Sequence, residues 1–169
     1  MSRDQQLRAL AILLVLLFLA ILRPTIGLGL GALHSRKVQL GATELTVPQG
    51  WTLSYASGKM AISKPCYTIF CGSPRAGFVV EASKLPANSN EVWARSAGKV
   101  LQHLYPDAGI RTVDLDFGRL KCVELDAAVD GKVAASCLNS DSRLTSTFRG
   151  ESDLKAVFYQ VLTAAHKVE

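Results

Sequence analysis

The sequence predicts an α+β fold behind an N-terminal membrane segment, and three observations support this. Residues 9–22 include no polar side chain. Short segments of alternating apolar and polar residues follow, separated by turn residues, as in an antiparallel sheet. Two other segments repeat their apolar residues at helical spacing. We therefore expect a signal-anchor helix with a Gly-rich stalk in residues 1–33, then an extracytoplasmic antiparallel sheet covered by two amphipathic helices in residues 37–168.

The apolar run predicts where the protein works. As a helix, residues 9–22 span about 21 Å, which is short against a hydrocarbon core of about 30 Å. Arg8 and Arg23 flank the run and can extend the span by reaching the headgroups. We expect a retained single-pass anchor, with the body outside the cytoplasm in the periplasm or on the cell surface. The alternative is a secreted domain freed by signal-peptide cleavage near residues 29–31.

Length and charge narrow the possible partners. A chain of 169 residues with one apolar leader predicts one folded domain. The net charge is +5, but no basic run and no basic stretch interleaved with aromatic residues occurs. We therefore expect no nucleic-acid partner. The basic excess between His34 and Arg75 is typical of an ordinary solvated surface.

The first half of the body is predicted to consist of strands. Residues 38–47 are rich in β-branched side chains and end at the turn Pro48-Gln49-Gly50. Trp51 opens the next strand, and turn or loop residues separate the later ones. The further strands expected in this half are residues 51–55, 59–63, 66–71 and 77–85.

A helix is expected next. Asn88 or Ser89 can cap its start, and Pro106 ends it. Its apolar residues recur at helical spacing and predict one buried stripe. The stripe comprises Trp93, Ala97, Val100, Leu101 and Leu104.

Strands then return, followed by a second helix. In residues 111–117, Val113 and Leu115 alternate with Asp114 and Asp116. Residues 120–129 and 132–140 flank Asp130-Gly131, and a two-residue hairpin there would place Val129 opposite Lys132 and Val123 opposite Leu138. Residues 142–150 form the last expected strand. The second helix begins near residues 151–153 and ends near His166. Its predicted buried stripe comprises Leu154, Val157, Phe158, Val161, Leu162 and Ala165.

This order of elements resembles a known family. Val-Pro-x-Gly-Trp ends a strand at residues 47–51, an Asp-Gly hairpin follows the first helix, a strand closes on Phe148-Arg149-Gly150, and the last helix carries Phe158 and Leu162. Over residues 37–168 the chain resembles the PsbP-like α/β/α sandwich of photosystem II extrinsic proteins and many exported bacterial proteins. The resemblance implies a binding or assembly module, not usually an enzyme. A retained anchor departs from those proteins' cleaved targeting peptides.

The cysteines predict disulfides. An even number of cysteines in an exported domain favours bridges. We expect the most local of the three pairings, Cys66–Cys71 and Cys122–Cys137. In the hairpin above, Cys122 and Cys137 are diagonal neighbours that a slight bulge would bring together. Four free thiols in a cytoplasmic domain, or a tetrathiolate zinc site without the usual C-x2-C pairs, are the alternatives.

No catalytic motif is present. The sequence has neither His-Glu-x-x-His nor Gly-x-Ser-x-Gly, and no C-x-x-C redox motif. His34, His103 and His166 are expected at the surface or at helix ends, and Trp51 and Trp93 in the core. We expect no catalytic, cofactor-binding or metal-binding residues, and a non-catalytic module that binds another protein or envelope component. The alternative is an enzyme with an unrecognised hydrolase or thiol-redox site, built on Asp114 and Asp116 or on the cysteines.

Overall fold

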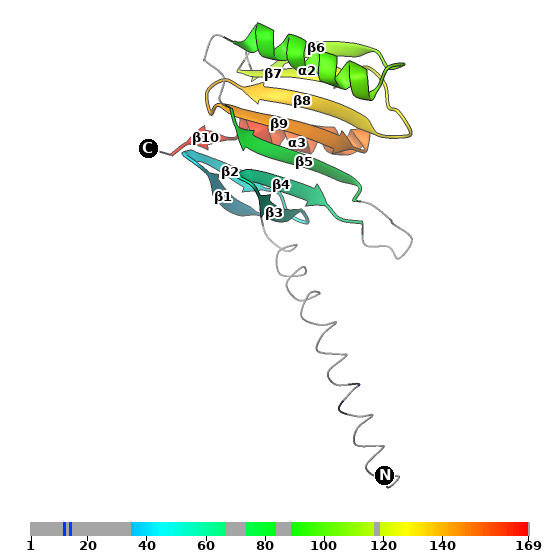
Figure 1. Ribbon diagram of the computed structural model, residues 1–169. Coiled ribbons are helices and arrows are strands. Elements are labelled where there is room, and N and C mark those ends of the chain that lie inside the picture. The colour runs from blue at the N-terminus through cyan, green and yellow to red at the C-terminus, as the bar shows by residue number, and fades with distance from the viewer. Residues whose placement is uncertain are drawn as a thin grey trace.

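The computed structural model describes residues 12, 14, 35–66, 74–83, 89–116 and 119–168. These residues form two antiparallel sheets and two α-helices (Figure 1). The larger sheet has the order β3-β4-β5-β9-β8-β7-β6, and the smaller has the order β1-β2-β10. The strands are β1 Arg36–Leu40, β2 Thr43–Val47, β3 Thr52–Ala56, β4 Lys59–Lys64, β5 Ala76–Ala82, β6 Ile110–Leu115, β7 Leu120–Leu125, β8 Val133–Asn139, β9 Leu144–Gly150 and β10 His166–Lys167; the helices are α2 Asn90–Leu104 and α3 Lys155–Thr163.

The main core lies on one face of the large sheet. The register of β5 and β9 sets Phe78 opposite Phe148, and both side chains are fully buried. Phe158 of α3 contacts both rings, at centroid distances of 5.2 and 5.1 Å. Leu45 and Val47 of β2 complete this core, so α3 and the small sheet together cover one face of the large sheet. Trp51 belongs to the same core, which confirms its predicted burial.

The small sheet arises where the sequence predicts one strand and a helix end. Residues 38–47 form a hairpin because Gly41, with a φ of +62°, turns the chain between β1 and β2. His166, expected near the end of the last helix, instead pairs with Glu44 in β10. The second helix is correspondingly shorter than predicted, although Phe158, Val161, Leu162 and Ala165 of its stripe are buried.

The predicted fold class is therefore wrong. We expected one sheet covered by two amphipathic helices behind an anchor helix, whereas the described residues form ten strands in two sheets with only two short helices. No helix among the described residues is long and apolar enough to cross a membrane. The predicted anchor and stalk in residues 1–33 lie outside the described residues, apart from Ile12 and Leu14.

The helix α3 is tied to the large sheet by a buried carboxylate. Glu124 of β7 is 2% exposed. Its two carboxylate oxygens accept hydrogen bonds from Arg111 of β6 at 2.8 Å and from Lys155 of α3 at 2.8 Å, and Tyr159 of α3 donates a further one. Burial alone would raise the pKa of Glu124, but these three donors outweigh it and hold the pKa below the ordinary value. Burial and the bond to Glu124 raise the pKa of Tyr159.

The β7–β8 hairpin carries the predicted disulfide. Cys122 and Cys137 are directly opposite each other and bonded, with Cα atoms 4.1 Å apart, on the face that α3 covers. The predicted contact of Val129 with Lys132 is confirmed. Further along, Val123 pairs with Ser136 and not with Leu138, because the segment before Val129 leaves the ladder.

The remaining described cysteine is also oxidised. Cys66 is disulfide-bonded, and its predicted partner Cys71 lies outside the described residues. None of the described cysteines is a free thiol, so neither the free-thiol nor the tetrathiolate alternative fits them.

Candidate binding groove

The helix α2 lies on the other face of the large sheet, over β6, β7 and β8 (Figure 1). Trp93 and Leu101 pack on Val123, Ala134 and Leu138 in a second, smaller core, which confirms the predicted burial of Trp93. Ser89 provides no side-chain cap, in contrast to the prediction, and Asn88 lies outside the described residues. Instead, the Asn90 side chain donates a hydrogen bond to Ser140 beyond the end of β8, which fixes the start of the helix over the sheet.

Part of the predicted buried stripe of α2 faces solvent. Val100 is 57% exposed and Leu104 is 62% exposed, although both belong to the apolar stripe that helical spacing predicts. They lie on the flank of α2 that points toward the uncovered strands, where they line a hollow with Trp93 and Ala97. The prediction of their burial is wrong because no described element covers this flank.

A groove runs along this flank of α2, and its floor is the sheet. One hollow of about 450 Å³ lies between Trp93 and the end of β5, where Glu81 and Ser83 line it. A second hollow, of about 260 Å³, continues along Val100 and Leu104. Trp93, Ser136 and Thr147 line both, so the two hollows form one groove. We call this surface the α2 groove; its lining comprises Glu81, Ala82, Ser83, Trp93, Ser96, Ala97, Val100, Leu101, Leu104, Ser136, Thr145 and Thr147.

The floor extends over the half of the sheet that no described element covers on this face; we call it the uncovered half. On this face β4 and β5 present Ala61, Ser63, Gly77 and Val79, the last of them 40% exposed. Side chains in this half are small, whereas the opposite face of the same strands carries Met60, Ile62, Phe78 and Val80 of the main core. The uncovered half therefore offers a shallow, mostly uncharged surface beside α2.

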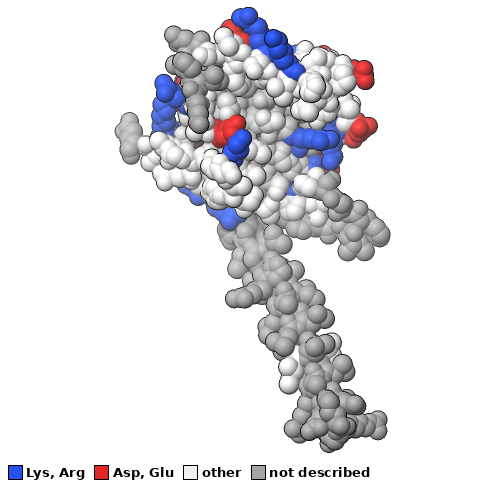
Figure 2. Space-filling model, in the orientation of Figure 1, with Lys and Arg blue, Asp and Glu red and all other residues white. Residues whose placement is uncertain are grey.

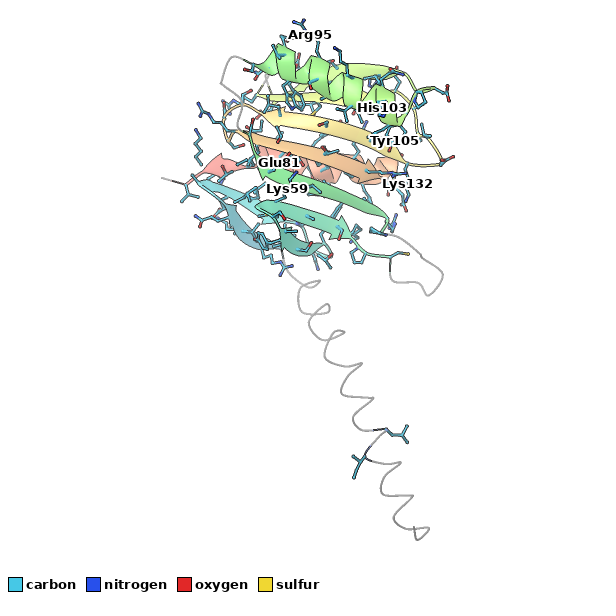
Figure 3. All side chains as sticks on the ribbon, in the orientation of Figure 1. Lys59, Glu81, Arg95, His103, Tyr105 and Lys132 are labelled. Atoms are coloured by element: carbon cyan, nitrogen blue, oxygen red, sulfur yellow. A yellow bond between two sulfur atoms is a disulfide. The ribbon has the colours of Figure 1, made fainter. Side chains whose placement is uncertain are left out.

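Charge is confined to the margins of the groove. At one end Lys59 and Glu81 form an ion pair of 2.7 Å, and Figure 3 shows the two side chains together on this face. Arg149 extends from the other end of β9, and Arg95 and Lys99 lie on the outer side of α2. Figure 2 shows the middle of this face white, apart from one adjacent acid–base pair, with Lys and Arg side chains and some Asp and Glu side chains around it.

The structure separates the residues that the sequence suggested as an acid pair. Asp114 is held by Lys121, at 3.1 Å, and this lysine also binds Glu91 of α2. Asp116 has left the strand, with a φ of +49°, and lines a different hollow at the end of the sheet beside Arg119 and His166. Asp114 and Asp116 therefore do not act as a pair.

The histidines do not join a site together. His103 is exposed near the end of α2, and His34 lies outside the described residues. His166 lies 3.6 Å from Glu44 at the edge of the small sheet. In the described part of the chain, no three His, Cys, Asp or Glu side chains converge as metal ligands. The expectation that the protein has no metal-binding or cofactor-binding residues stays a prediction from the sequence.

The α2 groove has the chemistry of a binding surface. Its wall is apolar and its floor carries hydroxyl groups, two of which, on Ser136 and Thr147, lie 3.5 Å apart. Among the described lining residues, Glu81 carries the one carboxylate, and Lys59 neutralises it.

The sequence singled out the wall residues of the groove only as a buried helix stripe, and it did not single out the residues of its floor. Thr145 and Thr147 alternate with buried Ser146 and Phe148, which indicates an outward face but not whether another element covers it. Nothing in the sequence separates the exposed Val100 and Leu104 from the buried residues of the same predicted α2 stripe.

Neither a family model nor a curated protein matches this chain. The resemblance to PsbP-like domains therefore stays a prediction.

Proposed function

We propose that this protein is a non-catalytic binding module that works outside the cytoplasm and holds a partner protein in the α2 groove. The observation that supports this most directly is the exposure of Val100 and Leu104 beside an uncovered half-sheet. Full burial of a Val or Leu side chain contributes about 1.5–3 kcal/mol. Covering the exposed part of each would therefore contribute roughly 1 kcal/mol to binding. Contiguous exposed apolar surface of this kind is typical of interaction sites.

The proposed location rests on the cysteines and the leader. Disulfides persist in oxidising compartments and are rare in the cytosol. The bonded Cys122–Cys137 pair and the oxidised Cys66 fit a domain that is carried across a membrane by the apolar run in residues 9–22. We propose that this run tethers the domain to the membrane or directs its export.

The location predicts the oxidation state of the cysteines in living cells. Cells that make the full chain are quenched with acid, and free thiols are labelled with a maleimide polymer that shifts the band on a gel. We expect no shift for the full chain, and a shift for a chain that lacks residues 1–33 and stays in the cytosol. Labelling of the full chain at all four cysteines would contradict an extracytoplasmic location.

The binding role predicts site-specific crosslinking. A photo-crosslinking amino acid at Val100 or Val79, both in the groove surface, should capture one discrete partner in cells that make the full chain. The matched control is Val168, which is as exposed as Val79, at 40%, but lies beyond β10.

A second variant makes this crosslinking test specific. Adding Val79→Glu should reduce capture from Val100 by about tenfold or more, since a buried unpaired charge costs well over 1.4 kcal/mol. Val168→Glu should leave capture unchanged. Equal products from all three positions, or capture that survives Val79→Glu, would overturn the proposed role of the groove.

A further inference from the structure

We infer that the α2 groove takes one amphipathic α-helix of the partner protein, with acidic side chains on the polar face of that helix. This inference rests on the proposed function and names the class of partner. It follows from the width of the uncovered sheet, from the size of the side chains on it, and from the charges around it.

The uncovered strip has the width of a single helix. The helix α2 covers β6, β7 and β8. On the same face, the next strands of the sheet, β9, β5, β4 and β3, are left uncovered by the described residues. Adjacent strands are about 4.8 Å apart, so these strands span roughly 14–19 Å. Packed helices lie about 8–10 Å apart, and a helix with its side chains is about 10–12 Å across. One helix therefore fits beside α2, and a pair of helices does not.

A helix suits a sheet face better than an extended segment does. The backbone hydrogen bonds of β4, β5 and β9 are used within the sheet, so this face offers no backbone partners. An extended peptide lying on it would leave its own N–H and C=O groups unpaired as it buried them. A helix satisfies its own backbone and needs only side-chain contact.

The side chains of the groove match an apolar helix stripe. Ala61, Gly77, Thr145 and Thr147 are short, so a helix can approach the floor closely. A side chain added at Gly77 would contact only Ile62 and Ser63 of the neighbouring strand β4, at 3.7 and 3.8 Å. No other described element therefore covers this position. The wall of Val100 and Leu104 supplies the lateral apolar contact.

The charges around the groove favour an acidic helix. Glu81 lines one end, but Lys59 already neutralises it. Arg149, at the other end, is exposed and makes no ion pair with the described residues, whereas Arg95 and Lys99 lie on the outer side of α2, away from the groove. The unpaired charge at the margin of the groove is therefore positive, and Asp or Glu on the partner's polar face would complement it.

The same charges disfavour a second copy of this chain. Inserting the α2 of another copy into the groove would bring its Arg95 and Lys99 toward Arg149. Like charges in contact oppose association. A self-associated dimer is therefore an outcome of the test below and not the expected result.

The test uses designed helical peptides as probes with the full chain in detergent. Three peptides of about 18 residues share one Leu/Ala stripe and carry Glu, Gln or Lys at the polar positions. We expect the Glu peptide to bind at least about tenfold more tightly than the Lys peptide at low salt, with the difference shrinking as salt rises. Backbone amide NMR shifts should be largest along α2, β5 and β9.

Matched variants localise the effect. Arg149→Glu should reverse the preference between the Glu and Lys peptides, whereas Arg36→Glu on the exposed surface of β1 should not. Equal affinity for all three peptides, shifts outside the groove, or a concentration-dependent dimer through the groove would each overturn the inference. If no peptide binds while the crosslinks from Val100 persist, the acidic-helix inference fails and the proposed function stands.

Discussion

Replacing Glu124 by glutamine is expected to lower the free energy of unfolding by about 3 kcal/mol. Removing one partner of a buried ion pair costs about 3–5 kcal/mol, because the other charge is left without compensation. The lower end applies here because Arg111 is half-exposed and can turn to water, whereas Lys155 is only 20% exposed. Tyr159 would also lose its strongest acceptor. Urea unfolding followed by tryptophan fluorescence measures the loss.

A surface carboxylate provides the control for Glu124. Glu44 binds Lys37, whose side chain is 70% exposed, at 2.8 Å. Exposed pairs of this kind contribute about 0–1 kcal/mol, so Glu44→Gln should change stability by less than about 1 kcal/mol. A Glu124→Gln protein as stable as the Glu44→Gln protein would show that α3 is held by packing alone.

The Glu124 anchor also predicts a pH dependence. The folded-state pKa of Glu124 lies below its ordinary value of about 4.3, so its contribution is complete above that pH and is lost as the pH falls through the folded-state pKa. The difference in the free energy of unfolding between the wild type and Glu124→Gln should therefore be constant from pH 7 to about pH 5 and shrink at lower pH. An advantage that grew on acidification would have the wrong sign for a depressed pKa.

Removing the Cys122–Cys137 disulfide is expected to cost a similar amount, about 3 kcal/mol. The two cysteines are 15 residues apart in sequence. Closing a loop of about this length stabilises a protein by about 3 kcal/mol, because the bridge restricts the conformations of the unfolded chain. Both sulfurs are fully buried in the main core, so the double variant Cys122→Ala/Cys137→Ala also loses packing. Denaturant unfolding of the double variant, without reductant, measures the change.

A second cysteine pair calibrates this loss. The double variant Cys66→Ala/Cys71→Ala removes the predicted bridge over a shorter segment, and the loss should be smaller because the closed loop is shorter. If reduced wild-type protein unfolded at the same denaturant concentration as oxidised protein, the loop-closure explanation would fail.

Local sequence patterns predicted most strands because alternation is a property of neighbouring residues. Val79 and Val80 are neighbours in a strand, so the sequence alone predicts that they lie on opposite faces of the sheet. The strands that hold Leu53, Ile62 and Phe148 are also predicted correctly. The pairing of β5 with β9 is different, since it joins residues such as Phe78 and Phe148 that are far apart in the chain. Nothing in either strand alone specifies that contact.

The Cys122–Cys137 disulfide was predicted correctly even though the predicted register was wrong. Moving Val123 from Leu138 to Ser136 shifts the register by two positions. Side chains alternate faces with a period of two, so such a shift leaves Cys122 and Cys137 on the same face. A shift by one position would have put the two sulfurs on opposite faces.

The groove could be predicted only in part. Helical spacing identifies the apolar side of α2, but the covering of that side depends on where the sheet ends. Trp93 and Leu101 lie over β7 and β8, whereas Val100 and Leu104 project beyond the strands that α2 covers. The sequence predicts one stripe, and only the tertiary arrangement divides it into a buried part and an exposed part.

The packing of β2 against α3 determines when the core of this domain can be completed during folding. Leu45 and Val47, near the start of the body, share a core with Phe158 and Leu162, near its end. A nascent chain emerging from a translocation channel N-terminus first would hold β1 and β2 without their partners until the final segment had passed. Were the chain exported as proposed, its core would be completed only after translocation, and the polypeptide would stay unfolded enough to pass through the channel.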